Sequence, residues 1–189
     1  MRSGITILLA VATCVGADRA NAPAATGTNW VETLRARLPV YGHRNWIVVA
    51  DSAYPAQSRE GIETIVADAD QLQVLGEVLS ELSRSRHVTP IVYTDRELKF
   101  LEEKDALGIS AYREQLSALL QNCNINVLPH EQIISKLDQV SQTFRVLIIK
   151  TNLALPYTSV FLQLDCAYWK PDAERRLRAT MAAGEHEKR

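Results

Sequence analysis

Short apolar runs alternate with longer segments of helical periodicity along this sequence, and that alternation restricts the folds open to the chain. Runs of strand length and composition lie at 46–50, 62–67, 88–93, 125–128, 144–150 and 160–164. Segments with apolar residues three and four positions apart lie at 29–40, 70–83, 109–120 and 131–140, and 96–107 fits a helix less clearly. The alternation predicts an α/β fold: a single domain with a central mixed, partly parallel sheet flanked by helices.

Length and composition favour one compact domain. The chain has 189 residues, of which 47% are hydrophobic, enough to fill one core but not two. The formal net charge is −1 and the domain holds no basic run, so a nucleic-acid surface is not expected. We place the domain at 29–169, followed by a polar tail at 170–189 that forms either a solvated helix or a disordered end.

The N-terminal residues follow the plan of a secretory signal peptide. Arg2 precedes an apolar run at 5–16, and Val15-Gly16-Ala17 offers the small residues that a signal peptidase reads. The run is short for a membrane span. We therefore expect a signal peptide at 1–17, a linker at 18–28, and export to the periplasm or the cell exterior. A buried N-terminal helix is the alternative.

The cysteines bear on the compartment and on metal binding. The residues that end in Cys14 resemble a lipobox, but Thr13 fits that motif poorly, so lipoprotein anchoring is the weaker alternative. Loss of the signal would leave Cys123 and Cys166, which can pair in an oxidising compartment or lie buried as small hydrophobes. Neither has a second ligand at zinc spacing, so no metal site is expected.

Titratable residues flank the first apolar run. His43 follows Gly42 just before the run, and Asp51 follows directly after it. An imidazole can take or give a proton near neutral pH, and a carboxylate can accept hydrogen bonds from neighbouring hydroxyls. A histidine at a helix end and an aspartate in a turn are the structural alternatives. A strand rises about 3.3 Å per residue, so the two side chains lie about 20 Å apart and cannot form a dyad in one straight segment.

Three segments together resemble the D-ribose pyranase and L-fucose mutarotase family. The residues from Gly42 to Pro55 fit the family's first motif, Gly-His-x-x-x-apolar-apolar-apolar-x-Asp-Ala-x-x-Pro, with Ser in place of its Ala. Pro129-His130-Glu131 resembles the family's second histidine, at the start of a late helix. Ile149-Lys150-Thr151, followed by Pro156-Tyr157-Thr158-Ser159-Val160-Phe161-Leu162, resembles the C-terminal motif, where the family usually has Pro-Tyr-Ala-Asn-Ile-Ile-Leu. The segments occur in the family's order, and the resemblance covers roughly residues 30–166.

The resemblance implies a cofactor-free isomerase that interconverts the anomers or ring forms of a monosaccharide. It implies a ring-shaped homo-oligomer with sites between subunits, which fits the distance between His43 and Asp51. The chemistry passes through the open-chain aldehyde and requires a base and an acid, but no metal or cofactor. His43 takes the catalytic role, and the residues implied to contact the sugar are Asp51, His130, Tyr157, Thr158 and Ser159.

Departures from the family pattern leave the sugar undefined. Ser159 replaces the usual asparagine, Thr158 replaces an alanine, and Leu153 stands where an acid is common. His130 can also be a structural cap, and Tyr157 an aromatic plug at a strand start. The alternative function is a non-catalytic monosaccharide-binding module on the same scaffold, and a structural ring protein without a ligand is a third.

Overall fold

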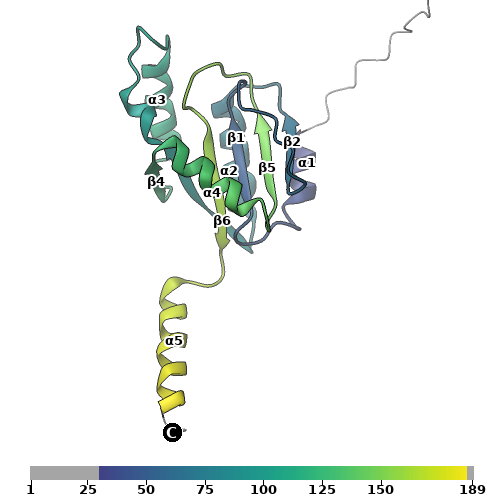
Figure 1. Cartoon of the computed structure of the whole chain (residues 1–189), viewed down its shortest axis with the longest axis vertical. Coiled ribbons are helices and arrows are strands. Elements are labelled where there is room, and N and C mark those ends of the chain that lie inside the picture. The colour runs from purple at the N-terminus through teal and green to yellow at the C-terminus, as the bar shows by residue number, and fades with distance from the viewer. Residues whose placement is uncertain (1–29, 187–189) are drawn as a thin grey trace, which may run out of the picture.

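Six strands form one mixed sheet in the computed structural model, which describes residues 30–186 (Figure 1). The spatial order is β2-β5-β1-β6-β3-β4. Strand β6 runs antiparallel to its neighbours β1 and β3, and the other pairs are parallel. The predicted mixed, partly parallel sheet is therefore confirmed. The strands are β1 (Trp46–Ala50), β2 (Ile62–Val66), β3 (Val88–Asp95), β4 (Ile125–Leu128), β5 (Val146–Lys150) and β6 (Val160–Cys166).

Helices cover both faces of the sheet. The core on one face joins α1 (Trp30–Arg37), α2 (Gln71–Arg84) and α3 (Ile109–Leu119) to the sheet through side chains such as Leu34, Leu75 and Ile109. On the opposite face, α4 (His130–Val140) packs Ile133 and Leu137 against the sheet (Figure 1). This arrangement explains why all five residues of β1 are buried and why that run is apolar throughout.

The strand directions bring six chain segments to one edge of the sheet. Five strands are parallel, so their carboxyl ends share an edge. The amino end of β6 lies at the same edge because β6 runs the other way. The register confirms this: Val160 pairs with Val49 and with Thr94. We call this side of the sheet the carboxyl edge, and the opposite side the amino edge.

The segment 96–107 is not the helix that the sequence suggested. It forms a short 3-10 helix, η1 (Arg96–Phe100), followed by a loop. The guanidinium group of Arg113 bonds the carbonyl oxygens of Leu98 and Leu101, at 3.2 and 2.7 Å. The Glu103 carboxylate accepts the backbone N–H groups of Gly108 and Ser110. These contacts with α3 satisfy polar groups that a longer helix would have used itself.

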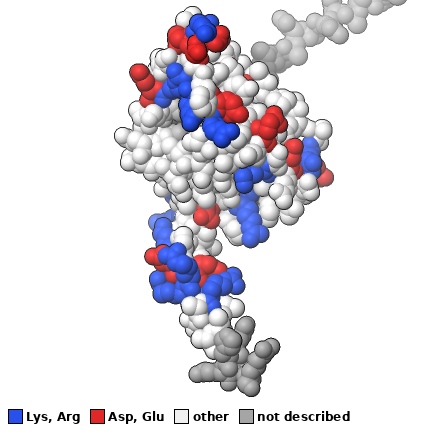
Figure 2. Space-filling view, turned by 60° about the vertical axis from the view of Figure 1, so that its left-hand side comes forward, with Lys and Arg blue, Asp and Glu red and all other residues white. Residues whose placement is uncertain are grey.

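The tail beyond the sheet is helical. Helix α5 (Pro171–His186) stands clear of the domain in Figure 1. Figure 2 shows basic and acidic side chains together on it. Arg175 pairs with Asp172, and Arg178 with Glu174. Of the two alternatives for the tail, the structure shows a helix with a solvated surface.

The predictions for the N-terminal residues and for the cysteines can be compared with the structure only in part. The predicted signal peptide and linker, at 1–28, lie outside the described residues. Cys123 and Cys166 both carry free thiols and are half-buried. Across residues 30–186 we find no helix with the length and hydropathy needed to cross a membrane.

Candidate functional site

Asp51 and Ser159 meet at the carboxyl edge, from the end of β1 and the start of β6. The Ser159 hydroxyl donates to Asp51 Oδ2 at 2.8 Å and accepts the Asp51 backbone N–H at 3.2 Å. Asp51 Oδ1 accepts the Ala53 N–H at 2.9 Å, so the carboxylate also caps the turn that follows the strand. Asp51 is half-buried, whereas Ser159 is only 3% exposed. The carboxylate therefore has lone pairs left for a ligand, and the serine hydroxyl has already donated its hydrogen.

His130 begins α4 and lies at the same edge. Its Nδ1 is 3.0 Å from Asp95 Oδ2, at the last residue of β3. Its backbone N–H donates to Glu97 Oε2, also at 3.0 Å. The His130 side chain is 31% exposed, whereas that of Asp95 is fully buried. Burial raises the pKa of the Asp95 carboxyl, and the hydrogen bond with His130 offsets part of this rise.

Tyr157 joins His130 at this edge. Their rings meet edge to face, with the centroids 5.5 Å apart. Tyr157 is 39% exposed and has a φ of 56°, in the left-handed region that residues with a Cβ rarely occupy. Non-glycine residues in this conformation cost free energy and are concentrated at functional sites. The residue lies in the turn that leads into β6.

Thr158 lies behind the edge and has no surface for a ligand. It is 1% exposed, and its hydroxyl donates to the Leu155 carbonyl at 2.7 Å. Its own carbonyl accepts from the Tyr112 hydroxyl at 2.9 Å. That hydroxyl also lies 2.6 Å from Gln71 Oε1. A buried network of α2 and α3 side chains thus supports the turn that presents Tyr157 and Ser159.

The structure separates His43 from the other predicted site residues. His43 precedes β1 at the amino edge, next to the last residues of β6, because Arg44 donates its N–H to the Leu164 carbonyl at 2.8 Å. There it lines a hollow together with Asp165, Tyr168 and Trp169. One chain therefore brings Asp51, His130, Tyr157 and Ser159 to one edge and His43 to the other.

Asp95 and Lys150 belong to the carboxyl edge but were not among the predicted site residues. Asp95 ends an apolar run in the same way as Asp51 does, and that repeated pattern was the signal available. Lys150 ends β5 beside Ala50, and its Nζ donates to the Tyr54 carbonyl at 2.7 Å. The sequence feature that could have indicated Lys150 is its position at the carboxyl end of a predicted strand, where polar residues often form a site.

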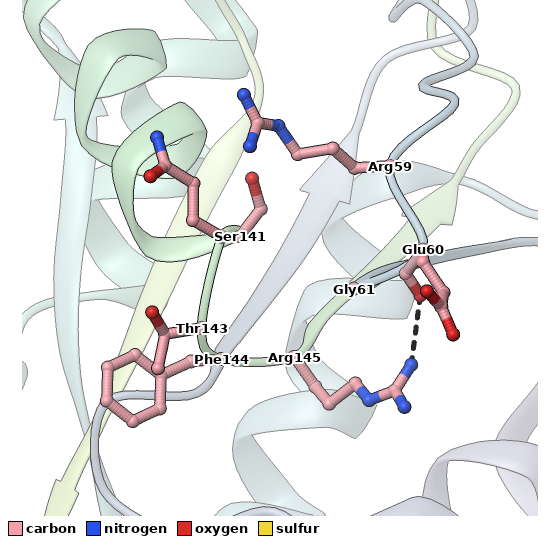
Figure 3. Close-up of a pocket in the computed structure, with 8 residues that line it drawn as sticks. Arg59, Glu60, Gly61, Ser141, Thr143, Phe144 and Arg145 are labelled. Atoms are coloured by element: carbon pink, nitrogen blue, oxygen red, sulfur yellow. Dashed lines mark hydrogen bonds between the residues drawn. The ribbon is translucent and has the colours of Figure 1, made fainter.

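A polar hollow of about 400 Å³ lies at the amino edge (Figure 3). Arg59, Ser141 and Arg145 are among its lining residues, and Arg145 donates to the Glu60 carbonyl at 2.9 Å. Gly61 allows the two lining loops to touch, because a Cβ there would lie 2.6 Å from the Ser141 carbonyl oxygen. The hollow contains none of the predicted site residues. Within residues 30–186, no group of three His, Cys, Asp or Glu side chains could hold a metal ion.

These features define the class: a mixed α/β domain whose polar groups converge at the carboxyl ends of its parallel strands. No protein-family model matches the sequence, and no curated protein matches it. Among solved structures, RbsD of Bacillus subtilis in complex with D-ribose is similar, with a TM-score of 0.50 and 20% identity. The match covers 69% of this chain and 89% of that one.

Two further structures match with lower TM-scores. The fucose mutarotase of Streptococcus pneumoniae in complex with L-fucose has a TM-score of 0.43 and 18% identity, over 70% of this chain and 88% of that one. FucU of Bifidobacterium longum has a TM-score of 0.46 and 17% identity, over 70% of this chain and 92% of that one. The likeness to RbsD shows that this chain has the ribose pyranase-like fold, so the resemblance stated from the sequence is confirmed at the level of the fold.

Proposed function

We propose that this chain is a cofactor-free sugar mutarotase or pyranase that interconverts anomers or ring forms of a monosaccharide. One observation carries the proposal: Asp51, His130 and Tyr157 are far apart in the sequence and converge at one edge of the sheet. The fold that holds them is similar to that of RbsD, a protein solved in complex with D-ribose. The substrate class is thus a monosaccharide.

The edge offers the groups that ring opening needs. A base takes the proton of the anomeric hydroxyl, and the electron pair left on oxygen forms the aldehyde C=O. The bond from C1 to the ring oxygen breaks, and the ring oxygen takes a proton from an acid. Closure on the other face, or by another hydroxyl, reverses both transfers. His130 is suited to proton transfer, the Tyr157 hydroxyl to donation, and Asp51 to holding sugar hydroxyls.

His43 enters this site from a second copy of the chain. It lies at the amino edge of its own chain, so it can reach a carboxyl edge only in an assembly. We propose a homo-oligomer, in the form of a ring, with each sugar bound between two copies. In this arrangement His43 supplies the second proton-transfer group, opposite His130.

Saturation-transfer NMR between sugar anomers tests the proposal. The full chain should accelerate exchange above the buffer rate for at least one sugar in a panel of pentoses and hexoses. Asp51→Asn should weaken sugar binding, because the amide keeps one acceptor but loses the charge. The absence of acceleration with every sugar would contradict the proposal.

A monosaccharide-binding module without catalysis is the second candidate. The observation in its favour is the hydroxyl of Ser159, which donates its hydrogen to Asp51 and has none left for a sugar. Saturable sugar binding by calorimetry, combined with unchanged anomer exchange, would support this candidate and exclude the isomerase.

We also propose that the chain is exported after cleavage of residues 1–17. The support is the sequence plan of Arg2, the apolar run and the small residues that end at Ala17. N-terminal sequencing of the protein from its native envelope fraction should give Asp18 as the first residue. Intact Met1 on protein from the cytoplasmic fraction would contradict this proposal.

A further inference from the structure

Two acidic side chains hold the first residue of α4 from separate directions. Asp95 bonds the imidazole of His130, and Glu97 bonds its backbone N–H, each at 3.0 Å. The preceding Pro129 is extended, with φ −54° and ψ 141°, and offers no side-chain cap of its own. The orientation of His130 therefore depends on the segment that ends β3.

Asp95 has one partner for its carboxyl group. The residue is 2% exposed, and its Oδ1 is buried without a hydrogen-bond partner among residues 30–186. An unsatisfied oxygen on a fully buried carboxyl group is costly and calls for a functional explanation. The other oxygen, Oδ2, is hydrogen-bonded to His130, so the imidazole is the one side chain that this carboxyl group contacts through a hydrogen bond among the described residues.

His130 presents its two ring nitrogens to different surroundings. Nδ1 faces buried Asp95, whereas Nε2 has no hydrogen-bond partner within the described part of the chain. The ring is partly exposed and meets Tyr157 edge to face. An ionised carboxylate can only accept a hydrogen bond, so the nitrogen that faces it must carry the hydrogen.

We infer that Asp95 is a positioning residue that holds His130 as the Nδ1–H tautomer and leaves Nε2 as an unprotonated acceptor at the carboxyl edge. The role of Nε2 toward a sugar hydroxyl rests on the proposed function, whereas the tautomer does not. A buried acid that orients an imidazole in this way is a recurring device in acid–base catalysis. The sequence did not single out Asp95 for this task.

Charges around Asp95 act in both directions on its ionisation. Burial raises the pKa of Asp95, and the charges of Glu97 and Asp51 add to the rise, whereas His130 lowers it. A neutral Asp95 would donate to Nδ1 and reverse the hydrogen bond. The tautomer of His130 therefore reports directly which arrangement is present.

Long-range ¹⁵N–¹H correlation spectra of the full ¹⁵N-labelled chain test the inference, at a pH where the ring is neutral. His130→Gln identifies the resonances of His130 by their disappearance. We expect a protonated Nδ1 and an unprotonated Nε2 in the wild type. In Asp95→Asn, whose amide can donate to Nδ1, the fraction of Nε2–H should rise several-fold. Glu102→Gln is the matched control, because Glu102 is exposed and pairs with Lys104 in the same segment.

Activity gives a second readout. If a sugar is turned over, Asp95→Asn should slow anomer exchange at least about tenfold, and Glu102→Gln should leave it unchanged. A wild-type spectrum with Nε2–H as the main tautomer overturns the inference, as does Asp95→Asn with unchanged tautomer and exchange. If Asp95→Asn fails to fold, the wild-type spectrum still decides. The predicted tautomer without any sugar turnover supports the positioning role and counts against the proposed function alone.

Discussion

The hydrogen bonds that each polar residue at the carboxyl edge already makes determine what it can still offer to a ligand. Asp51 keeps lone pairs for a ligand after bonding Ser159 and the Ala53 N–H. Ser159 is satisfied, and Thr158 is buried with its hydroxyl on a backbone carbonyl. Of the predicted contact residues, Asp51, Tyr157 and His130 are thus the ones with groups left to meet a ligand. The resemblance suggested five contact residues. The structure shows that some of them are exposed and that Thr158 and Ser159 are buried supports. This division depends on tertiary hydrogen bonds, which a local sequence motif does not reveal.

Tyr112→Phe should destabilise the domain. The Tyr112 hydroxyl is shared between Gln71 Oε1 and the Thr158 carbonyl, both buried. Its loss removes the single hydroxyl hydrogen that these two buried acceptors share, and we expect a decrease of about 1–3 kcal/mol in the free energy of unfolding. Urea unfolding measures this change. Tyr168→Phe, at a side chain 75% exposed, should change it by less than about 0.5 kcal/mol. Equal effects in the two variants would contradict the account.

Asp95 should make stability depend on pH in a defined direction. Burial raises its pKa above the ordinary value of 3.8. Between that value and the raised pKa, the folded chain binds more protons than the unfolded chain, so the contribution of Asp95 to stability falls as pH rises. Asp95→Asn lacks this titration. Its free energy of unfolding relative to the wild type should therefore rise with pH in urea titrations, from about pH 4 until the raised pKa of Asp95 is passed. A difference that stays constant with pH would refute this.

At the scale of helices and strands, local patterns predicted most of the fold. The runs at 46–50 and 125–128 coincide with β1 and β4. Asp70 caps α2 by accepting the N–H groups of Leu72 and Gln73, as a residue of its type does before a helical run. The prediction of a helix over the whole segment 96–107 was wrong, because Arg113 of α3 donates hydrogen bonds to the carbonyls of Leu98 and Leu101. That contact is tertiary and leaves no local signal.

Helix α5 should be dispensable for the stability of a single domain. Its described side chains are mostly exposed, including Leu177 at 43% and Met181 at 47%. A chain that ends after Lys170 should therefore keep its free energy of unfolding within about 1 kcal/mol of the full chain in urea titrations. A larger loss, together with a smaller mass in light scattering, would show that α5 packs against another copy.

At the scale of the whole molecule, the position of His43 decides how a site can be assembled. The rise of a strand predicted that His43 and Asp51 lie apart, and the structure places them at opposite edges of the sheet. The sequence could not predict which surfaces of two copies form an interface, because such contacts depend on the folded surface rather than on local periodicity. The amino edge of one copy must therefore meet the carboxyl edge of another for His43 to act.

Subunit complementation tests whether His43 of one copy completes the carboxyl edge of another. His43→Ala and His130→Ala should each lower saturation-transfer exchange between sugar anomers at least about tenfold, with the fold intact by circular dichroism. When the two variants are unfolded, mixed in equal amounts and refolded together, about a quarter of the sites should combine an intact carboxyl edge with an intact His43. Exchange should then recover to about a quarter of the wild-type rate. A mixture no more active than the average of the two variants would contradict a site shared between copies.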